Sequence, residues 1–263
     1  MPADTLPPLP HIPRAALVTG AAKRIGRAIA LGLAEAGYAI AVHHLHSHAE
    51  AESLVAEIKA RGGKAVALAC DLADKAATET LLGNASAALG PIGVLVNSAS
   101  VFERDEALSA TRESWDRHME ANLRAPFVLT QALARALPHE AGGAVINLVD
   151  ERVWNLTPHF VSYTVSKAAL WTLTQTLALA LAPRIRVNAI GPGPVLPSPR
   201  QSDEQFTRQW RGLPLKRPAT PEEVASAVRF LLETPSITGQ MIALDSGQHL
   251  GWTFPHTDGA IEE

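Results

Sequence analysis

Residues 15–26 read AALVTGAAKRIG, and this stretch decides the fold. Its first four residues form a short apolar run of the kind found in buried strands. A turn bounded by Gly20 and Gly26 follows, and an Ala- and Leu-rich helical pattern then continues to Ala36. Strand, glycine turn and helix in this order are the context that a dinucleotide-binding loop requires. The free N–H groups of such a helix N-terminus suit a pyrophosphate, and the glycines let the backbone approach it closely.

The alternation of short apolar runs and helical periods continues along the whole chain, whose 263 residues are 47% apolar and 19% charged. This pattern predicts one α/β domain: a Rossmann-type, doubly wound parallel sheet of about seven strands with helices on both faces. The predicted strands are 15–19, 38–43, 64–69, 93–97, 143–149, 185–189 and 240–244. The predicted helices are 24–36, 47–61, 74–88, 110–136, 160–182 and 221–232.

The two ends of the chain differ from its middle. Residues 1–13 contain five prolines and little to bury, so we expect a flexible arm, then the domain at 14–251 and a tail at 252–263. No apolar run is long enough to span a bilayer and no signal peptide pattern is present, which predicts a soluble, cytoplasmic protein without a membrane partner. The net charge of −3 offers no basic field for nucleic acid. A single cysteine, Cys70, excludes an intrachain disulfide.

A second informative array lies beyond the middle of the chain, where Tyr163 follows Asp150 by thirteen positions and Lys167 follows Tyr163 by four. Positions i and i+4 of a helix share one face, so the ammonium of Lys167 is expected close to the phenol of Tyr163. A neighbouring cation favours the phenolate, which makes the pair a proton donor and acceptor usable near neutral pH. The array predicts a hydride-transfer site that contains an unusual acid, Asp150.

Several further motifs occur in a familiar order. The stretch 97–100, NSAS, follows the fourth apolar run, and Asn122 and then Pro192-Gly193 come later. With the glycine turn and the Tyr-Lys pair, this order resembles the short-chain dehydrogenase/reductase family over roughly residues 14–251. The resemblance implies a Rossmann-fold reductase that assembles as a homotetramer through its long helices.

The end of the second predicted strand bears on the choice of cofactor. NAD-specific members of this fold place an acid there to bind the ribose 2′-hydroxyl, and such a carboxylate repels a 2′-phosphate. Residues 39–47 read AIAVHHLHS, with no acid before Glu50. Lys23, Arg24, His46 and Ser47 instead offer donors to a phosphate, which favours NADPH. By the family resemblance, Asp71 contacts the adenine amino group.

The histidines of this segment allow another interpretation. His44, His46 and His48 alternate and could share one side of an extended segment, as zinc ligands do. No Cys, Asp or Glu nearby completes a tetrahedral set, so we predict no metal site.

The chain departs from most of its family at three places, with Arg24 in place of a third loop glycine, Asp150 in place of a serine, and the segment 97–102, NSASVF, where a glycine more commonly follows Asn-x-Ala. Together with Ser100 and Phe102, these residues resemble the pteridine reductases and the bacterial dihydromonapterin/dihydrofolate reductases of this fold. The end of the domain, residues 245–250, is also similar to theirs. The resemblance implies that Arg24 faces cofactor phosphate and substrate, and that Phe102 and the nicotinamide enclose the pterin ring.

Chemistry gives an independent reason for Asp150. A serine hydroxyl donates to a ketone oxygen that is becoming an alkoxide, whereas a carboxylate there would oppose that charge. Reduction of a C=N bond requires a proton on ring nitrogen, which a carboxylic acid or a carboxylate-assisted Tyr163 can deliver. Asp150 therefore indicates an N-heterocycle, and which of the two groups donates the proton stays open at this point.

These arguments give the candidate site. The catalytic candidates are Asp150, Tyr163, Lys167 and Asn122. The cofactor-binding candidates are Thr19, Gly20, Lys23, Arg24, Ile25, Gly26, His44, His46, Ser47, Asp71, Leu72, Asn97, Ala99, Lys167, Pro192, Gly193 and Val195. The substrate-binding candidates are Arg24, Ser100, Phe102, Asp150, Trp154 and Tyr163. Residues 194–214, with Phe206 and Trp210, correspond to the substrate-covering loop of the family.

The predicted function is NADPH-dependent reduction of a small molecule, a pterin or folate, from the dihydro to the tetrahydro form. Two alternatives remain open. One is an NADPH-dependent ketone or quinone reductase of the same family that tolerates Asp150. The other is a non-catalytic dinucleotide-binding module, although the intact Tyr163, Lys167 and Asn122 argue against it.

Overall fold

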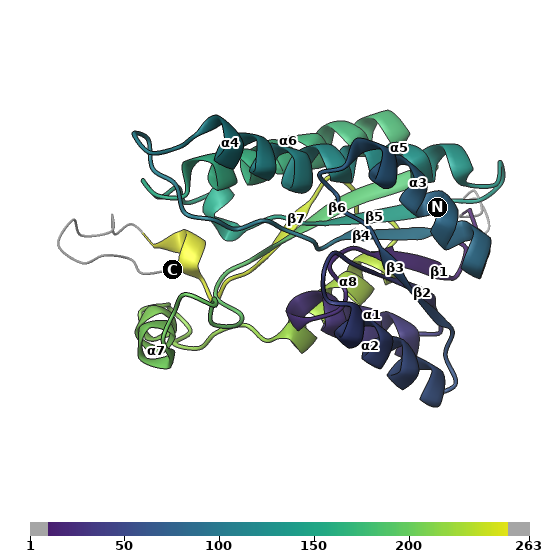
Figure 1. Cartoon of the computed structure of the whole chain (residues 1–263), viewed down its shortest axis with the longest axis horizontal. Helices are drawn as coiled ribbons and strands as arrows, with labels where there is room; N and C mark the ends of the chain where they lie inside the picture. Colours follow the sequence, from purple (N-terminus) through teal and green to yellow (C-terminus); the bar gives the residue numbers. More distant parts are fainter. Residues whose placement is uncertain (1–9, 252–263) are drawn as a thin grey trace, which may run out of the picture.

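Strand β1 (Ala15–Val18) lies inside a seven-stranded parallel sheet, between β2 and β4 (Figure 1). The computed structural model describes residues 10–251. The strand order is β3-β2-β1-β4-β5-β6-β7, so the winding reverses between β1 and β4. Open sheets of this kind bind ligands at that reversal, outside the carboxyl ends of the strands. The other strands are β2 (Ala39–His44), β3 (Ala65–Ala69), β4 (Val94–Asn97), β5 (Gly143–Leu148), β6 (Ile185–Pro192) and β7 (Met241–Leu244).

Helices cover both faces of the sheet, α1, α2 and α8 on one side and α3 to α6 on the other, while α7 lies apart from both layers (Figure 1). The long helices are α1 (Arg24–Glu35), α2 (His48–Ala60), α3 (Lys75–Leu89), α4 (Arg112–Met119), α5 (Ala125–Ala136), α6 (Val161–Leu181), α7 (Asp203–Arg211) and α8 (Pro221–Glu233). The fold class is therefore the one predicted.

The apolar runs of the strands fill two cores at once. In β1, Ala16 and Val18 pack into the core formed with α1 and α8, whereas Leu17 packs into the core formed with α3 and α5. Successive side chains of a strand point to opposite faces, and both faces of this sheet are covered. This explains why the strand segments are continuously apolar rather than alternating.

One predicted helix, 110–136, is interrupted. The structure has α4, then a π-helical turn at Glu120–Arg124, then α5. Pro126 explains the change, because proline has no N–H to donate and its ring crowds the carbonyl four residues earlier, which belongs to Asn122. The wider π turn relieves that crowding and sets Asn122 apart from the regular helix.

The described residues at the N-terminus are attached to the domain. His11 forms an isolated parallel bridge with Ala141, and its carbonyl accepts from the N–H of Gly142 at 3.0 Å. Contacts to the domain thus begin before residue 14, where the flexible arm was expected to end. Most of the predicted arm, residues 1–9, and the predicted tail, 252–263, lie outside the described residues. Among the helices within residues 10–251, none combines the length and apolarity that crossing a membrane requires.

His43, near the end of β2, holds the glycine turn in place. Its Nδ1 accepts from the N–H of Gly20 at 3.0 Å, and its backbone carbonyl accepts from the N–H of Ala21 at 2.9 Å. Since Nδ1 is an acceptor, Nε2 carries the proton and donates to the Cys70 carbonyl at 3.0 Å. Burial lowers the pKa of His43 from 6.5 to about 4, so the neutral imidazole that the turn requires is the stable form.

We predict that His43 makes folding stability depend on pH between 6.5 and 4. The unfolded chain binds this proton more readily than the folded one, so the stabilisation is complete above pH 6.5 and is lost as the pH falls towards 4. His43→Asn keeps an acceptor for Gly20 and does not titrate. Urea unfolding at several pH values should show lower stability at neutral pH, by roughly 1–3 kcal/mol, and a shallower loss on acidification. A slope equal to that of the original protein would contradict this account.

Candidate active site

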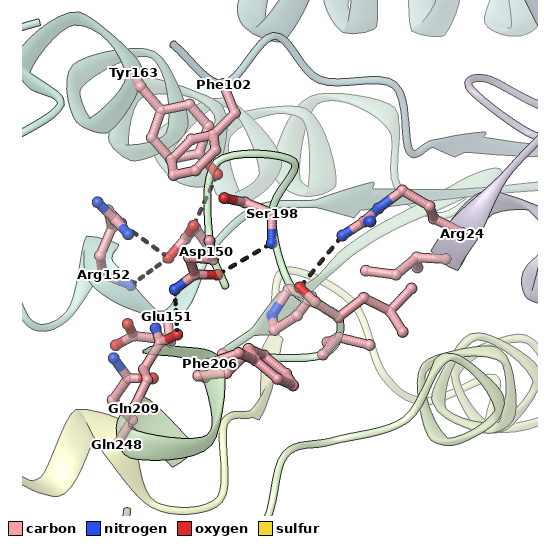
Figure 2. A pocket seen from close by; sticks show the side chains of 17 residues that line it. Arg24, Phe102, Asp150, Glu151, Arg152, Tyr163, Ser198, Phe206, Gln209 and Gln248 are labelled. Atoms are coloured by element: carbon pink, nitrogen blue, oxygen red, sulfur yellow. Dashed lines mark hydrogen bonds and ion pairs between the residues drawn. The ribbon is translucent and has the colours of Figure 1, made fainter. Parts of the chain in front are cut away.

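The structure brings Asp150 and Tyr163 into direct contact (Figure 2). Asp150 lies two residues beyond the end of β5, and Tyr163 lies in the first turn of α6. The phenol Oη donates to Asp150 Oδ2 at 2.7 Å. The intervening residues leave the sheet through a short 3-10 turn, Glu151–Val153, and return at the start of α6. The carboxylate is therefore the immediate partner of the phenol proton.

Lys167 acts on Tyr163 as a nearby charge. It is 2% exposed, and its Nζ donates to the Leu148 carbonyl at 2.7 Å. The same Nζ lies 5.8 Å from the centre of the Tyr163 ring. Burial lowers the pKa of Lys167 to about 8, against the opposing effect of Asp150, so most molecules keep this ammonium at neutral pH.

Asp105 positions the start of α6, although no local sequence pattern indicates this role. The residue before α6, Phe160, has a left-handed backbone (φ 58°) and no side-chain cap. Asp105 supplies the cap from 57 positions away, since its carboxylate accepts from the Ser162 N–H at 3.1 Å and its carbonyl from the Phe160 N–H at 2.9 Å. Burial acts to raise the pKa of Asp105, but hydrogen bonds from Ser162 and Ser114 hold it below its ordinary value. An ionised cap also suits the positive end of a helix.

Asn122 joins the loop after β4 to α6, the helix that carries Tyr163 and Lys167. Its Oδ1 accepts from the Val101 N–H at 2.8 Å, and its Nδ2 donates to the Val101 carbonyl at 2.9 Å and to Ser166 Oγ at 3.1 Å. Ser166 lies between Tyr163 and Lys167 on α6. The Asn122 side chain therefore connects Val101 to the part of α6 that carries Tyr163 and Lys167.

Phe102 is part of an aromatic wall beside Tyr163. Its ring stacks on that of Phe160 with centres 4.6 Å apart, and it meets the Tyr163 ring edge-on at 4.6 Å. From the loop after β6, the Arg200 guanidinium lies 5.4 Å from the Phe102 ring centre and donates to the Phe102 carbonyl at 2.7 Å. Phe102 is thus held from two sides at the edge of the site.

A cavity of about 190 Å³ lies in front of the Asp150–Tyr163 pair (Figure 2). Arg24 lies across the cavity from Asp150, and the loop after β6 together with α7 forms the remaining wall. Its lining is Arg24, Ile25, Phe102, Asp150, Glu151, Arg152, Tyr163, Pro192–Leu196, Ser198, Gln201, Phe206, Gln209 and Gln248. Sequence reasoning missed Glu151, Arg152 and the three glutamines, because only the folded chain brings these polar side chains to one surface.

Two predicted substrate residues lie elsewhere. Trp154 does not line this cavity, because the turn after Asp150 directs its ring towards Trp171 and His249, with ring centres 6.4 and 5.4 Å away. The role of Trp154 as a wall of the substrate site stays a prediction. Ser100 lines a second, neighbouring cavity, and its hydroxyl lies 3.4 Å from Asn122 Oδ1.

The second cavity, of about 600 Å³, extends over the glycine turn and the ends of β2, β3 and β4. Helix α1 begins at Arg24 without a side-chain cap and with no acidic residue in its first turn, so its N–H groups are available to an anion. These features fit the pyrophosphate and adenosine parts of a dinucleotide. The predicted cofactor residues that line it are Gly20, Lys23, Arg24, Ile25, Gly26, Asp71, Leu72 and Ala99.

The glycines of the turn serve close packing of the backbone. A Cβ on Gly20 would lie 2.9 Å from Ala99 Cα, and one on Gly26 would lie 2.3 Å from the Gly20 carbonyl oxygen. Gly20 also has a left-handed backbone, with φ +64°. The sequence prediction assigned both glycines to the approach of a pyrophosphate. In the structure Gly20 also lets the turn pack against Ala99, just after β4, and Gly26 lets the start of α1 pack against Gly20.

Arg24 joins the two cavities. It lines both of them, and its Nη2 donates to the Leu196 carbonyl at 3.3 Å. Its backbone is left-handed (φ 53°), a conformation that costs a residue with a Cβ roughly 1 kcal/mol or more. Strain of this kind is tolerated where a side chain is needed, and here it directs a guanidinium to the boundary between the cavities.

Other predicted cofactor residues line neither cavity: Thr19, His44, His46, Ser47, Asn97 and Lys167. Thr19 Oγ1 accepts from the Ser98 and Ala99 N–H groups at 3.0 Å, and Asn97 Nδ2 donates to Asn147 Oδ1 at 2.8 Å. These two side chains brace the carboxyl ends of the strands. Pro192, Gly193 and Val195 line the smaller cavity instead.

One unexpected contact joins the glycine turn to α2. Lys23 Nζ lies 2.5 Å from Glu50 Oε1, with both side chains about half exposed. An exposed ion pair contributes only about 0–1 kcal/mol, so an incoming phosphate can compete for Lys23. The described residues contain no cluster of three or more His, Cys, Asp or Glu side chains able to hold a metal ion.

Residues 20–249 match the family model described as Enoyl-(Acyl carrier protein) reductase. A curated relative, the 3-oxoacyl-(acyl-carrier-protein) reductase FabG of Staphylococcus epidermidis, is 33% identical over 242 residues, which are 90% of this chain and 99% of the relative.

Two solved structures are more similar in sequence. The FolM alternative dihydrofolate reductase 1 of Brucella canis, complexed with NADP, is 48% identical with a TM-score of 0.89 and covers 92% of this chain and 96% of its own. Its counterpart from Brucella suis, also with NADP, is 47% identical with a TM-score of 0.89, over 94% and 99%. The chain belongs to the short-chain dehydrogenase/reductase family.

Proposed function

We propose that this protein is an NADPH-dependent reductase of a dihydropterin or dihydrofolate. The observation that carries the proposal is the 2.7 Å hydrogen bond from Tyr163 to Asp150, a carboxylate on the wall of the smaller cavity. Phe102 and Arg24 line the same cavity. The similarity to the FolM dihydrofolate reductases supports the same function.

The cofactor sites follow from the two cavities. The N-terminus of α1 and Arg24 would hold the pyrophosphate, and Asp71 would meet the adenine. Lys23, His46 and Ser47 would bind the 2′-phosphate. When bound, NADPH supplies the hydride. The structures of similar proteins that contain NADP support this choice over NAD.

The residues of the smaller cavity provide the remaining chemistry. Phe102 would support the flat face of the heterocycle, and Arg24 would bind its polar edge. Tyr163 gives its proton to ring nitrogen while hydride adds to the adjacent carbon, so that C=N becomes HC–NH. Asp150 orients the phenol and accepts hydrogen bonds from N–H groups of the ring.

A second function, reduction of a carbonyl group, is favoured by the curated relatives, which are 3-oxoacyl-(acyl-carrier-protein) reductases. The same tyrosine and lysine could protonate a ketone oxygen. Asp150 argues against carbonyl reduction, because a carboxylate beside a developing alkoxide opposes the new charge.

A homotetramer is a further proposal, made from the family resemblance. Helix α6 exposes the apolar side chains of Val165 and Leu179, which are 40% and 84% exposed. Light scattering of the purified protein tests the oligomeric state.

We predict that the protein oxidises NADPH with 7,8-dihydrobiopterin, 7,8-dihydromonapterin or 7,8-dihydrofolate and turns over ketones and quinones poorly. The reason is the match between a ring nitrogen that requires a proton and the Asp150–Tyr163 pair. The measurement is kcat/KM for each acceptor, with NADH as the matched cofactor control. Efficient ketone turnover with inert dihydropterins would support the carbonyl reductase instead.

Variants of the pair separate the two functions further. Tyr163→Phe removes the proton donor and should lower kcat by at least ~100-fold, with NADPH binding retained. Asp150→Ser restores the residue common in the family, so we expect dihydropterin turnover to fall by roughly 10- to 1000-fold and ketone turnover to stay level or rise. Equal activity of Asp150→Ser towards dihydropterins would show that the carboxylate has no part in the reaction.

A further inference from the structure

Arg152 is a second buried cation beside the catalytic tyrosine, and it lines the smaller cavity (Figure 2). The residue is 5% exposed. The centre of its guanidinium lies 5.6 Å from the ring centre of Tyr163, 5.6 Å from that of Phe102 and 5.3 Å from that of Phe160. Aromatic faces attract a guanidinium at such distances, so its position among the three rings is a stable one.

Arg152 also holds one oxygen of Asp150. Its backbone N–H donates to Oδ1 at 2.9 Å, and its Nε lies 3.4 Å from the same oxygen. The other oxygen, Oδ2, accepts from Tyr163 Oη at 2.7 Å. Every one of these contacts places a donor against the carboxylate, which suits the ionised form because that form only accepts.

This arrangement creates an electrostatic problem for the proposed reaction. Once Tyr163 gives up its proton, a phenolate lies next to the Asp150 carboxylate, and two like charges so close disfavour each other strongly. A serine in place of Asp150 would not cause this. Lys167, with Nζ 5.8 Å from the Tyr163 ring centre, supplies one positive charge, and the Arg152 guanidinium, at 5.6 Å, supplies another.

Among the described residues, none of the other charged or titratable groups near the phenol supplies a positive charge beside both Tyr163 and Asp150. The His118 ring meets Tyr163 edge-on at 6.0 Å, but burial lowers the pKa of His118 and favours its neutral form. Glu151 lines the same cavity and is negative when ionised. Arg24 lies on the opposite wall, towards the second cavity. Arg200 lies over Phe102, at the edge of the site.

We propose that Arg152 is a positioning residue that balances the charge of Asp150, so that Tyr163 can give up its proton beside a carboxylate. This inference rests on the proposed function only for the identity of the substrate. In the reductive step the O–H bond of Tyr163 breaks, its proton forms an N–H bond, and the hydride electron pair forms the new C–H bond. The phenolate that remains is the species that Arg152 and Lys167 stabilise.

Ionisation of Tyr163 can be measured directly, because the chain contains only two tyrosines, Tyr38 and Tyr163. In a Tyr38→Phe background, the near-ultraviolet absorbance of the phenolate reports Tyr163 alone. Arg152→Gln should raise the pH midpoint of this titration by about one unit, whereas Arg152→Lys should change it less, because it keeps the charge. An unchanged midpoint in folded Arg152→Gln would overturn the inference, whatever the substrate.

A double-mutant cycle tests whether Arg152 acts through Asp150. With the best acceptor of the panel, Arg152→Gln should lower kcat by roughly 10- to 100-fold and raise the solvent deuterium isotope effect. In the Asp150→Ser background the same change should cost at most about threefold. An equal cost in both backgrounds contradicts the mechanism. If the unsubstituted protein does not reduce dihydropterins, the proposed substrate class is wrong. The pH titration of Tyr163 still decides the role of Arg152.

Two further variants separate the effect of the Arg152 charge from a general loss of stability. Arg186 is a partly buried arginine that lines neither of the two cavities described above. Its guanidinium donates to the carbonyls of Leu231 and Leu232 in the last turn of α8 and of Thr234 and Ile237 after it. Arg186→Gln should therefore lower stability and leave the Tyr163 titration and kcat unchanged. If Arg152→Gln does not fold, Arg152→Met, which fills the space among the rings without charge, takes its place, with the same expected rise of the midpoint.

Discussion

The hydrogen bond between Tyr163 Oη and Asp150 Oδ2, at 2.7 Å, is the interaction on which the rest of the site depends. It places a carboxylate where the proton donor acts, and it constrains the charges around it. A carboxylate at this point opposes a developing alkoxide but tolerates an amine product, which favours the proposed reduction of a C=N bond. It also makes the phenolate harder to form, which accounts for two buried cations, Lys167 and Arg152, near one tyrosine ring.

The fold keeps that bond in place through contacts distant in sequence. Asp105 caps the helix that carries Tyr163, and Asn122 ties the same helix to the loop that carries Phe102. Burial keeps His43 neutral, and this side chain holds the glycine turn that follows β1. Buried polar side chains with satisfied hydrogen bonds fix a geometry more firmly than apolar packing alone, because each requires a specific partner. The rigidity of the site thus comes from a few long-range polar contacts.

The elements of the fold could be predicted because apolar periodicity reports burial directly. The array of Asp150, Tyr163 and Lys167 could also be predicted, since helical spacing and a strand end determine where these residues lie. Arg152, Asp105 and the glutamines could not be found, because their roles arise from contacts between segments with no local pattern. The contact of Trp154 with Trp171 could not be predicted either, because the three-residue turn between Asp150 and Trp154 has no periodic pattern that indicates where the ring lies. Pro126 alone would have predicted the break in the helix expected at 110–136. The helical periodicity of that segment hid the effect of this proline on Asn122.

The most direct test of the account follows the hydride itself. Dihydropterin is reduced with NADPH that carries deuterium at the transferable position of the nicotinamide, and the product is analysed by mass spectrometry and NMR. The account predicts a tetrahydropterin with one deuterium on the ring carbon next to the newly protonated nitrogen. A pterin recovered unreduced and unlabelled, while a ketone in the same mixture becomes a deuterated alcohol, would contradict it.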